Sequence, residues 1–233
     1  MAAKMAQLVV FDIDGTLTST TMVDAECYLQ ALVEWLNGPV DTDWSTYRHV
    51  TDTGIASEAH ERAGRGTPSS AELAELRERF LRLLAAALTS RPARCRAVPG
   101  ASRTISRLRR IPGVHLGLAT GAWKKSAELK LRHCEIPTNG LAFASANDSP
   151  SRERILELSV HRALRLANLR SFTRVTYVGD GVWDVAAARS LGLRFVGVAY
   201  DAPPDPLAAE GVAVVVNDLR GPDLLDYLLV DRG

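Results

Sequence analysis

Two carboxylates stand one residue apart where the first apolar run of the chain ends. Asp12 and Asp14 follow the run Leu8 to Phe11, and Gly15 and Thr16 come directly after them. If the run is a strand, both carboxylates share one face at its carboxyl end, where open α/β sheets bind ligands. Two unpaired acids there repel each other, which favours a bound cation. Gly15 and Thr16 let the backbone turn sharply, and we expect their N–H groups to face an anion.

A second pair of acids follows another apolar run far along the chain. Asp180 and Asp184 lie just beyond the run Val175 to Val178, in a loop that contains two glycines. Carboxylates four residues apart can direct one oxygen at a metal and another at the water molecules around it. Helix capping would explain one acidic turn by itself. Two such turns on separate parallel strands indicate a shared site instead.

A hydroxyl group and a glycine follow a third apolar run. Thr120 and Gly121 come directly after His115 to Ala119, again at a predicted strand end. There they could contact a ligand bound at the strand ends, and the alternative is that Thr120 or a neighbour caps the helix that begins near Trp123.

Two arginines open the helical pattern Ser151 to Leu169. A guanidinium of Arg152 or Arg154 would neutralise charge on a phosphate held at the strand ends. We favour Arg152, and the alternative for either arginine is an ion pair with a glutamate on the helix surface.

These groups need a scaffold that brings distant strand ends together, and the sequence predicts one. Five apolar runs read as buried parallel strands: Leu8 to Phe11, His115 to Ala119, Val175 to Val178, Arg194 to Val198 and Val212 to Val216. Between them lie stretches with helical spacing: Ala101 to Arg110, Lys124 to His133, Ser151 to Leu169 and Val185 to Leu191. This alternation predicts an α/β fold with a doubly wound, mostly parallel, Rossmann-like sheet.

One region interrupts the alternation and reads as an inserted all-helical cap. Its helical patterns are Met22 to Leu36, Trp44 to Ala63 and Ala71 to Leu88. We therefore predict a core formed by residues 1–20 and 92–233 and a cap formed by residues 21–91, joined by hinge-like linkers. Within the cap, the polar residues Thr51, Asp52, Thr53 and Gly54 are expected to close over the substrate and select it. The alternative is an ordinary turn between helices.

The composition gives no sign of a nucleic-acid-binding, secreted or membrane-spanning protein. The formal net charge is +1, with 28 basic against 27 acidic residues, so no global charge indicates nucleic acid or an acidic membrane as a partner. The cysteines Cys27, Cys95 and Cys134 are widely spaced, which fits a reducing compartment. Residues Met1 to Gln7 lack the pattern of a secretory signal, and no apolar run is long enough to span a membrane. We expect a cytoplasmic protein.

With these motifs in place, the chain resembles the haloacid dehalogenase-like hydrolases. The string Asp12-Ile13-Asp14-Gly15-Thr16 looks like the family's first motif, Thr120 like its second, and Gly179-Asp180 through Asp184 like its fourth. The helical insertion resembles the cap of the phosphoglycolate phosphatase and β-phosphoglucomutase branch. The family's third motif is usually a lysine. Because the chain has no lysine after Lys130, an arginine must replace it.

The resemblance implies a role for each matched residue. Asp12 would attack phosphorus, Asp14 would protonate the leaving oxygen and later deprotonate water, and Thr120 would hold a phosphoryl oxygen. Magnesium would be bound by Asp12, the main-chain carbonyl of Asp14, and Asp180, with Asp184 in or next to the coordination shell. A cation is also expected on physical grounds, because a carboxylate at ~4 Å from a phosphate is repelled by about 4 kcal/mol per charge pair.

The function expected is a magnesium-dependent phosphatase acting on a small phosphorylated metabolite, such as phosphoglycolate or a sugar phosphate. A phosphomutase of the β-phosphoglucomutase type would use the same nucleophile and metal, and it stays open as the alternative. A non-catalytic binding module fits less well, since a binder needs no nucleophile together with a proton donor. A monomer and a homodimer are both compatible with the sequence.

Overall fold

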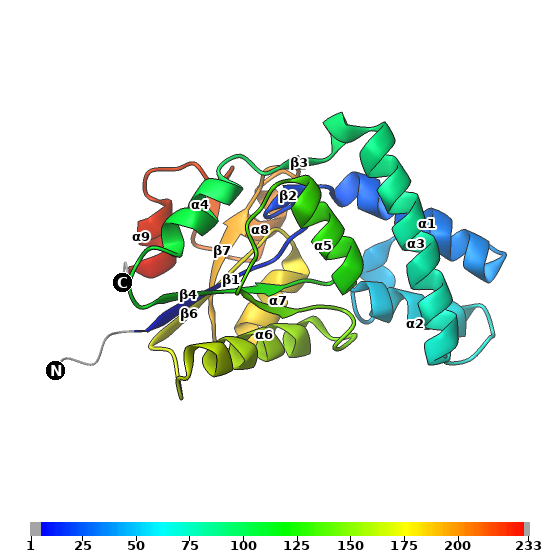
Figure 1. Ribbon diagram of the computed structural model, residues 1–233. Helices are drawn as coiled ribbons and strands as arrows, with labels where there is room; N and C mark the ends of the chain where they lie inside the picture. Colours follow the sequence, from blue (N-terminus) through cyan, green and yellow to red (C-terminus); the bar gives the residue numbers. More distant parts are fainter. Residues whose placement is uncertain (1–5, 231–233) are drawn as a thin grey trace.

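A parallel sheet with helices on both faces forms the centre of the molecule. The computed structural model describes residues 6–230. Most of the segment Met1 to Gln7, in which the sequence shows no secretory signal, lies outside the described residues. The six-stranded sheet has the order β5-β4-β1-β6-β7-β8, and every pair of neighbours is parallel (Figure 1). The strands are β1 Gln7–Phe11, β4 Val114–Ala119, β5 Ala142–Ala144, β6 Arg174–Gly179, β7 Arg194–Val198 and β8 Val215–Val216. The predicted doubly wound fold is confirmed.

Strand β1 lies in the middle of this sheet because it is apolar on both faces. Its last four residues are buried, as expected for a strand covered by helices on either side. Phe11 is in register with Leu118 of β4 and Val178 of β6, so three strands end at the same level. The residues that follow these three strands therefore meet at one edge of the sheet.

Each face of the sheet carries its own group of helices and its own apolar core. Helices α4 (Ala101–Leu108), α5 (Lys124–His133) and α9 (Leu224–Leu229) pack on one face, around residues such as Phe11 and Ile105. Helices α6 (Arg152–Ala167) and α7 (Val182–Ser190) pack on the other, around Val10 and Ile155. Helix α8 (Asp205–Ala209) packs near the β7–β8 side. These two layers hold the strand ends rigidly in place.

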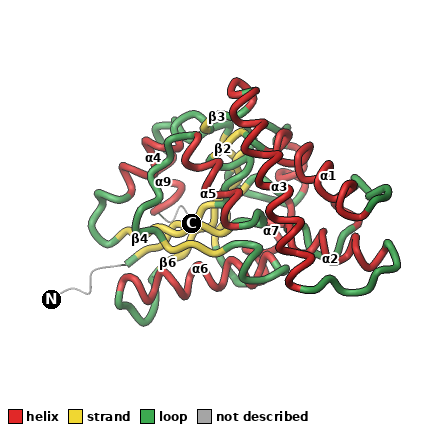
Figure 2. Tube along the Cα trace, turned by 45° about the vertical axis from the view of Figure 1, so that its right-hand side comes forward, coloured by secondary structure: helices red, strands yellow, loops and turns green. Residues whose placement is uncertain are grey.

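The inserted segment is helical, as predicted, and has a third apolar core. It contains α1 (Thr21–Leu36), α2 (Asp52–Arg62) and α3 (Ser70–Ser90), which gather at one end of the sheet in both views (Figures 1 and 2). Leu32 and Phe80 are fully buried between these helices. Two short 3₁₀ turns, η1 (Trp44–Thr46) and η2 (Pro92–Arg94), complete the segment and its exit.

Four details differ from the sequence-based expectation. The pattern Trp44 to Ala63 is split, because the side chain of Thr51 accepts a hydrogen bond from the Gly54 N–H and starts α2 as a new helix. Strand β5 was not predicted, and β8 is shorter than the run Val212 to Val216. The two linkers between core and cap also contain regular structure, since β2 (Thr18–Ser19) pairs antiparallel with β3 (Arg96–Ala97).

Within residues 6–230, no helix combines the length and the apolar character needed to cross a membrane.

Candidate active site

The candidate site lies at the carboxyl ends of β1 and β6, where the sheet order changes direction. From β1 the chain first adds β4 and β5 on one side and then crosses back to add β6 on the other. Ligands of doubly wound sheets bind in the crevice at such a point. Asp12 follows β1 and Asp180 follows β6, and the Asp12 N–H donates to the Val178 carbonyl at 2.9 Å.

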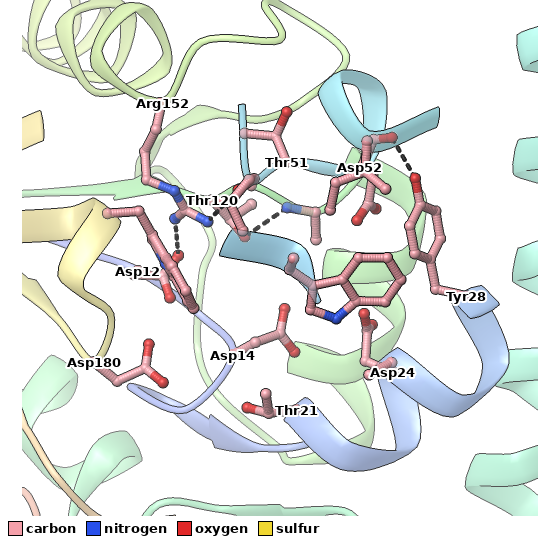
Figure 3. Close-up of a pocket in the computed structure, with 17 residues that line it drawn as sticks. Asp12, Asp14, Thr21, Asp24, Tyr28, Thr51, Asp52, Thr120, Arg152 and Asp180 are labelled. Carbon is pink, nitrogen blue, oxygen red and sulfur yellow. Dashed lines mark hydrogen bonds and ion pairs between the residues drawn. The ribbon is translucent and has the colours of Figure 1, made fainter. Parts of the chain in front are cut away.

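Three carboxylates from two distant segments converge there. One oxygen each of Asp12, Asp180 and Asp184 lie within 4.8 Å of one another. Asp12 and Asp184 are buried, and Asp180 is partly buried. Figure 3 shows Asp12 and Asp180 on the same side of the cavity. The convergence expected from the strand ends is therefore present.

Glycines make this close approach possible. A Cβ atom added to Gly15 would lie 1.9 Å from Oδ2 of Asp180, and the φ angle of Gly15 is +76°. A Cβ on Gly179 would lie 2.6 Å from Oδ2 of Asp184. Both positions thus exclude side chains because a carboxylate fills the space beside them.

The carboxylate cluster carries more negative charge than its surroundings compensate. Burial, followed by the charge of Asp184, raises the pKa of Asp12 well above its usual value, although Arg152 opposes the shift. Burial and Asp184 likewise raise the pKa of Asp180. Hard carboxylate oxygens at this spacing suit a divalent cation, which would remove the repulsion. The residues present therefore fit a metal site.

Arg152 is the arginine that reaches this cluster. Its Nη1 lies 3.2 Å from Oδ1 of Asp12 and 2.9 Å from Oδ1 of Asp184, and its Nη2 donates to the Val50 carbonyl at 3.2 Å. Arg154 instead pairs with Glu157 on the helix surface, with half of its side chain exposed. Of the two arginines, Arg152 is therefore the one whose side chain lies at the carboxylate cluster.

Asp184 is held in place by two further donors. The Tyr177 hydroxyl donates to its Oδ1 at 2.8 Å, and the Gly181 N–H donates to its Oδ2 at 3.1 Å. Tyr177 is fully buried in β6. This carboxylate is therefore fixed before any ligand binds.

Asp14 occupies a different environment from the cluster. Its Oδ1 accepts from the Thr20 hydroxyl and its Oδ2 from Lys130 Nζ, both at 2.6 Å. Lys130 also pairs with Asp24 of α1, and its side chain is completely buried. The two carboxylates hold the pKa of Lys130 above its usual value despite burial. Sequence reasoning missed Lys130 and Asp24.

The predicted phosphate-binding residues differ in how much of their hydrogen-bonding capacity is free. Thr120 Oγ1 accepts from the Ala122 N–H at 3.1 Å, so its own proton remains available to a ligand. Gly121 leaves room for Arg152, whose Nη2 would lie 2.3 Å from an added Cβ. The N–H groups of Gly15 and Thr16 donate to carbonyls within their own loop, to Thr18 and Ile13. Those two N–H groups are thus not free for an anion in this structure.

The segment Thr51 to Gly54 forms the first turn of α2 and contacts the core directly. Thr51 donates to the Pro150 carbonyl at 2.7 Å, and Thr53 donates to the Ala146 carbonyl at 2.6 Å. The Asp52 carboxylate accepts a hydrogen bond from the main-chain N–H of Trp123 at 2.7 Å. Thr51 and Asp52 line the cavity, while Thr53 and Gly54 do not. The segment therefore ties the cap to two core loops.

The cavity itself connects these groups. It has a volume of about 130 Å³ and lies between the strand ends and helices α1 and α2 (Figure 3). Asp12, Asp14, Thr120, Arg152 and Asp180 line its core side. Three carboxylates, a hydroxyl group and a cationic side chain thus face one small cavity.

The chain matches one protein-family model and resembles several solved structures. Residues 6–192 match the family model described as haloacid dehalogenase-like hydrolase. A hydrolase from Pseudomonas syringae has 18% sequence identity and a TM-score of 0.71, over 94% of this chain and 96% of its own. A predicted phosphoglycolate phosphatase from Haemophilus somnus has 19% identity and a TM-score of 0.64, over 97% and 99%. No curated protein sequence matches this chain significantly.

Two of the similar structures were solved with bound ligands. CbbY from Rhodobacter sphaeroides, solved in complex with phosphate, has 20% identity and a TM-score of 0.67, over 96% of this chain and 99% of its own. A mutant of the same protein was solved in complex with xylulose-(1,5)bisphosphate, with 20% identity and a TM-score of 0.68 over the same shares. At these identities the similarity shows a common fold alone.

Proposed function

Because the chain belongs to the haloacid dehalogenase-like hydrolases, we propose that it is a magnesium-dependent phosphatase that cleaves a small phosphomonoester. The observation that carries the proposal is the convergence of Asp12, Asp180 and Asp184 within 4.8 Å at the edge of the sheet. The relatives solved with phosphate and with a sugar bisphosphate support a phosphate ester as the substrate. The free cysteines agree with the cytoplasmic location we propose.

In this mechanism Asp12 is the nucleophile. One of its oxygens attacks phosphorus in line with the leaving oxygen, which gives an aspartyl-phosphate that water then hydrolyses. Asp12, Asp180 and Asp184, with the main-chain carbonyl of Asp14, would hold Mg²⁺, which would supply positive charge to offset the repulsion of the anionic nucleophile and the phosphoryl group. Thr120 donates its free hydroxyl proton to a phosphoryl oxygen, and Arg152 compensates the charge that develops there.

Asp14 acts as the general acid and base. Its hydrogen bonds from Thr20 and Lys130 keep its carboxylate apart from the metal cluster and at the cavity wall. It protonates the leaving oxygen in the first step and takes a proton from water in the second.

The test is a panel of phosphomonoesters assayed for phosphate release with Mg²⁺ and with EDTA. We expect activity that requires the metal and falls by several orders of magnitude in Asp12→Asn, while circular dichroism shows the fold intact. The matched control is Asp41→Asn, which removes an exposed cap carboxylate. Retention of a tenth of wild-type turnover by Asp12→Asn would refute the assignment. Isomer formation from glucose 1-phosphate with little free phosphate would identify a mutase instead.

A further inference from the structure

The two ends of the cavity differ in chemistry. The end at the sheet contains the nucleophile and Arg152, whereas the other end is built from α1 and from the start of α2. In Figure 3, Asp24, Tyr28 and Asp52 lie on the side away from Arg152 and Asp180. Phosphate bound at the sheet therefore directs its leaving group toward that second end, called the leaving-group end below and defined by Asp24, Tyr28, Trp44 and Asp52.

The leaving-group end offers no cation to an anionic substrate group. Among the described residues that line the cavity, Arg152 is the one cationic side chain, and it already contacts Asp12 and Asp184. Lys130 is buried behind Asp14 and Asp24 and does not line the cavity. A second phosphate or a carboxylate on the leaving group would thus face Asp52 and Asp24, and the cation beside Asp24, Lys130, is buried and already paired with Asp24 and Asp14.

Asp52 has an oxygen that no protein group satisfies. The residue is 7% exposed, its Oδ2 accepts from the Trp123 N–H, and its Oδ1 has no hydrogen-bond partner among the described residues. Burial and the charge of Asp24 raise its pKa. The nearby cation Arg77 lies outside the cavity, 5.3 Å from the centroid of the Trp123 ring. A cationic group in the cavity would satisfy the free oxygen and relieve the repulsion between the two carboxylates.

Aromatic rings complete this end. Tyr28 and Trp44 both line the cavity, with ring centroids 6.2 Å apart and planes tilted by 58°. The Tyr28 hydroxyl donates to the main-chain carbonyl of Asp52, which fixes the ring beside that carboxylate. Aromatic faces next to carboxylates attract ammonium groups.

We propose that the leaving group of the substrate carries an ammonium group and no second anion, so that the enzyme acts on the phosphoric monoester of a small amino alcohol. This inference rests on the proposed phosphatase function and specifies its substrate. Asp24 and Asp52 bind the ammonium, and the rings of Tyr28 and Trp44 enclose it. Phosphoglycolate, which ends in a carboxylate, is then a poor substrate.

Three phosphomonoesters with two-carbon leaving groups test this directly, because they differ in charge at the far end. They are phosphoethanolamine (cationic), 2-hydroxyethyl phosphate (neutral) and phosphoglycolate (anionic), assayed with Mg²⁺ near neutral pH. We expect kcat/KM to fall in that order, by about 10-fold or more from first to last. In Asp52→Asn and Asp24→Asn the ratio between cationic and anionic substrates should move toward one. In the control Asp41→Asn it should not change.

The outcomes separate the two proposals. Equal or better turnover of phosphoglycolate, or an unchanged ratio in Asp52→Asn, overturns the ammonium site while leaving the phosphatase intact. So does hydrolysis of p-nitrophenyl phosphate when none of the three esters reacts. Failure to hydrolyse p-nitrophenyl phosphate and all three of these esters with Mg²⁺ refutes the phosphatase itself and the ammonium site with it. If Asp24→Asn does not fold, Asp52→Asn decides the matter, because its amide oxygen can still accept the Trp123 N–H.

Discussion

Replacing Asp12 with asparagine should stabilise the metal-free protein while it abolishes activity. The carboxylate has two like charges within 4.8 Å, Asp180 and Asp184, and each repulsion is worth about 3.5 kcal/mol at an effective dielectric constant near 20. Arg152, at 3.2 Å, returns about 5 kcal/mol. The ionised carboxylate is therefore opposed by roughly 2 kcal/mol before the cost of burial is counted. Asparagine keeps an oxygen for Arg152 and removes the charge.

Thermal unfolding at pH 8 with EDTA measures this effect. For a chain of this length, about 2 kcal/mol corresponds to a rise in Tm of about 4–8 °C for Asp12→Asn. Adding Mg²⁺ should reverse the order, because a ligand at 100 times its Kd stabilises the folded state by about 2.7 kcal/mol, and the variant has lost one anionic ligand. The Asp41→Asn protein is the control, since its carboxylate is exposed and lies outside the cluster.

Two results would refute this reasoning. If Asp12→Asn is no more stable than the wild type in EDTA, the three carboxylates do not repel one another as the geometry requires. If Mg²⁺ raises the Tm of both proteins equally, Asp12 is not a ligand of the ion.

Two further predictions concern the buried ion pairs around Asp14. Lys130→Met should lower the free energy of unfolding by about 3–5 kcal/mol, measured with urea, because it leaves Asp14 and Asp24 without their cation; a loss below 1 kcal/mol would contradict a buried ion pair. Burial raises the pKa of Asp24 to about 6, so the stability that this carboxyl group contributes is present below about pH 4 and is lost as the pH rises through 6. Relative to Asp24→Asn, the wild type should lose about 3 kcal/mol between about pH 4 and pH 7, and a constant difference between their urea curves would disprove the shift.

The four acids were predictable because strand ends are readable in the sequence. Each pair follows an apolar run that is long enough to be a buried strand, and parallel strands bring their carboxyl ends to one edge. Asp12 and Asp180 therefore had to lie close together once the sheet formed. The position of Arg152 was harder to predict, because Arg154 lies only two residues away in the same helical turn. The two side chains differ in the direction in which they leave the helix, so that Arg152 contacts Asp12 and Arg154 contacts Glu157.

Lys130 could not be assigned in the same way. Helical spacing placed it in Lys124 to His133, where a lysine is ordinarily solvated. One signal was present: it lies three residues after Ala127 and next to Leu131, which are both buried on the inward face of α5. A lysine on an apolar stripe needs a buried counter-charge. The partners, Asp14 and Asp24, are more than a hundred residues away, so the pairing depends on tertiary structure.

The sequence-based prediction also missed short elements of secondary structure. Strand β5, Ala142–Ala144, has three residues and no β-branched side chain, and it forms because β4 offers an open edge. The break at Thr51 depends on a single hydroxyl that caps α2. Features of one to three residues do not produce a periodic pattern.

The pairing of β2 with β3 also bears on how such a chain can be rebuilt. The polypeptide leaves the sheet layer and returns to it through neighbouring antiparallel strands, with Ser19 opposite Arg96. Residues 20–95, which lie between these two positions, are thus inserted at one point, like an insert at the tip of a hairpin. A two-residue turn can bridge paired strands of this kind, so excision or exchange of the insert leaves the ends of the remaining chain already aligned.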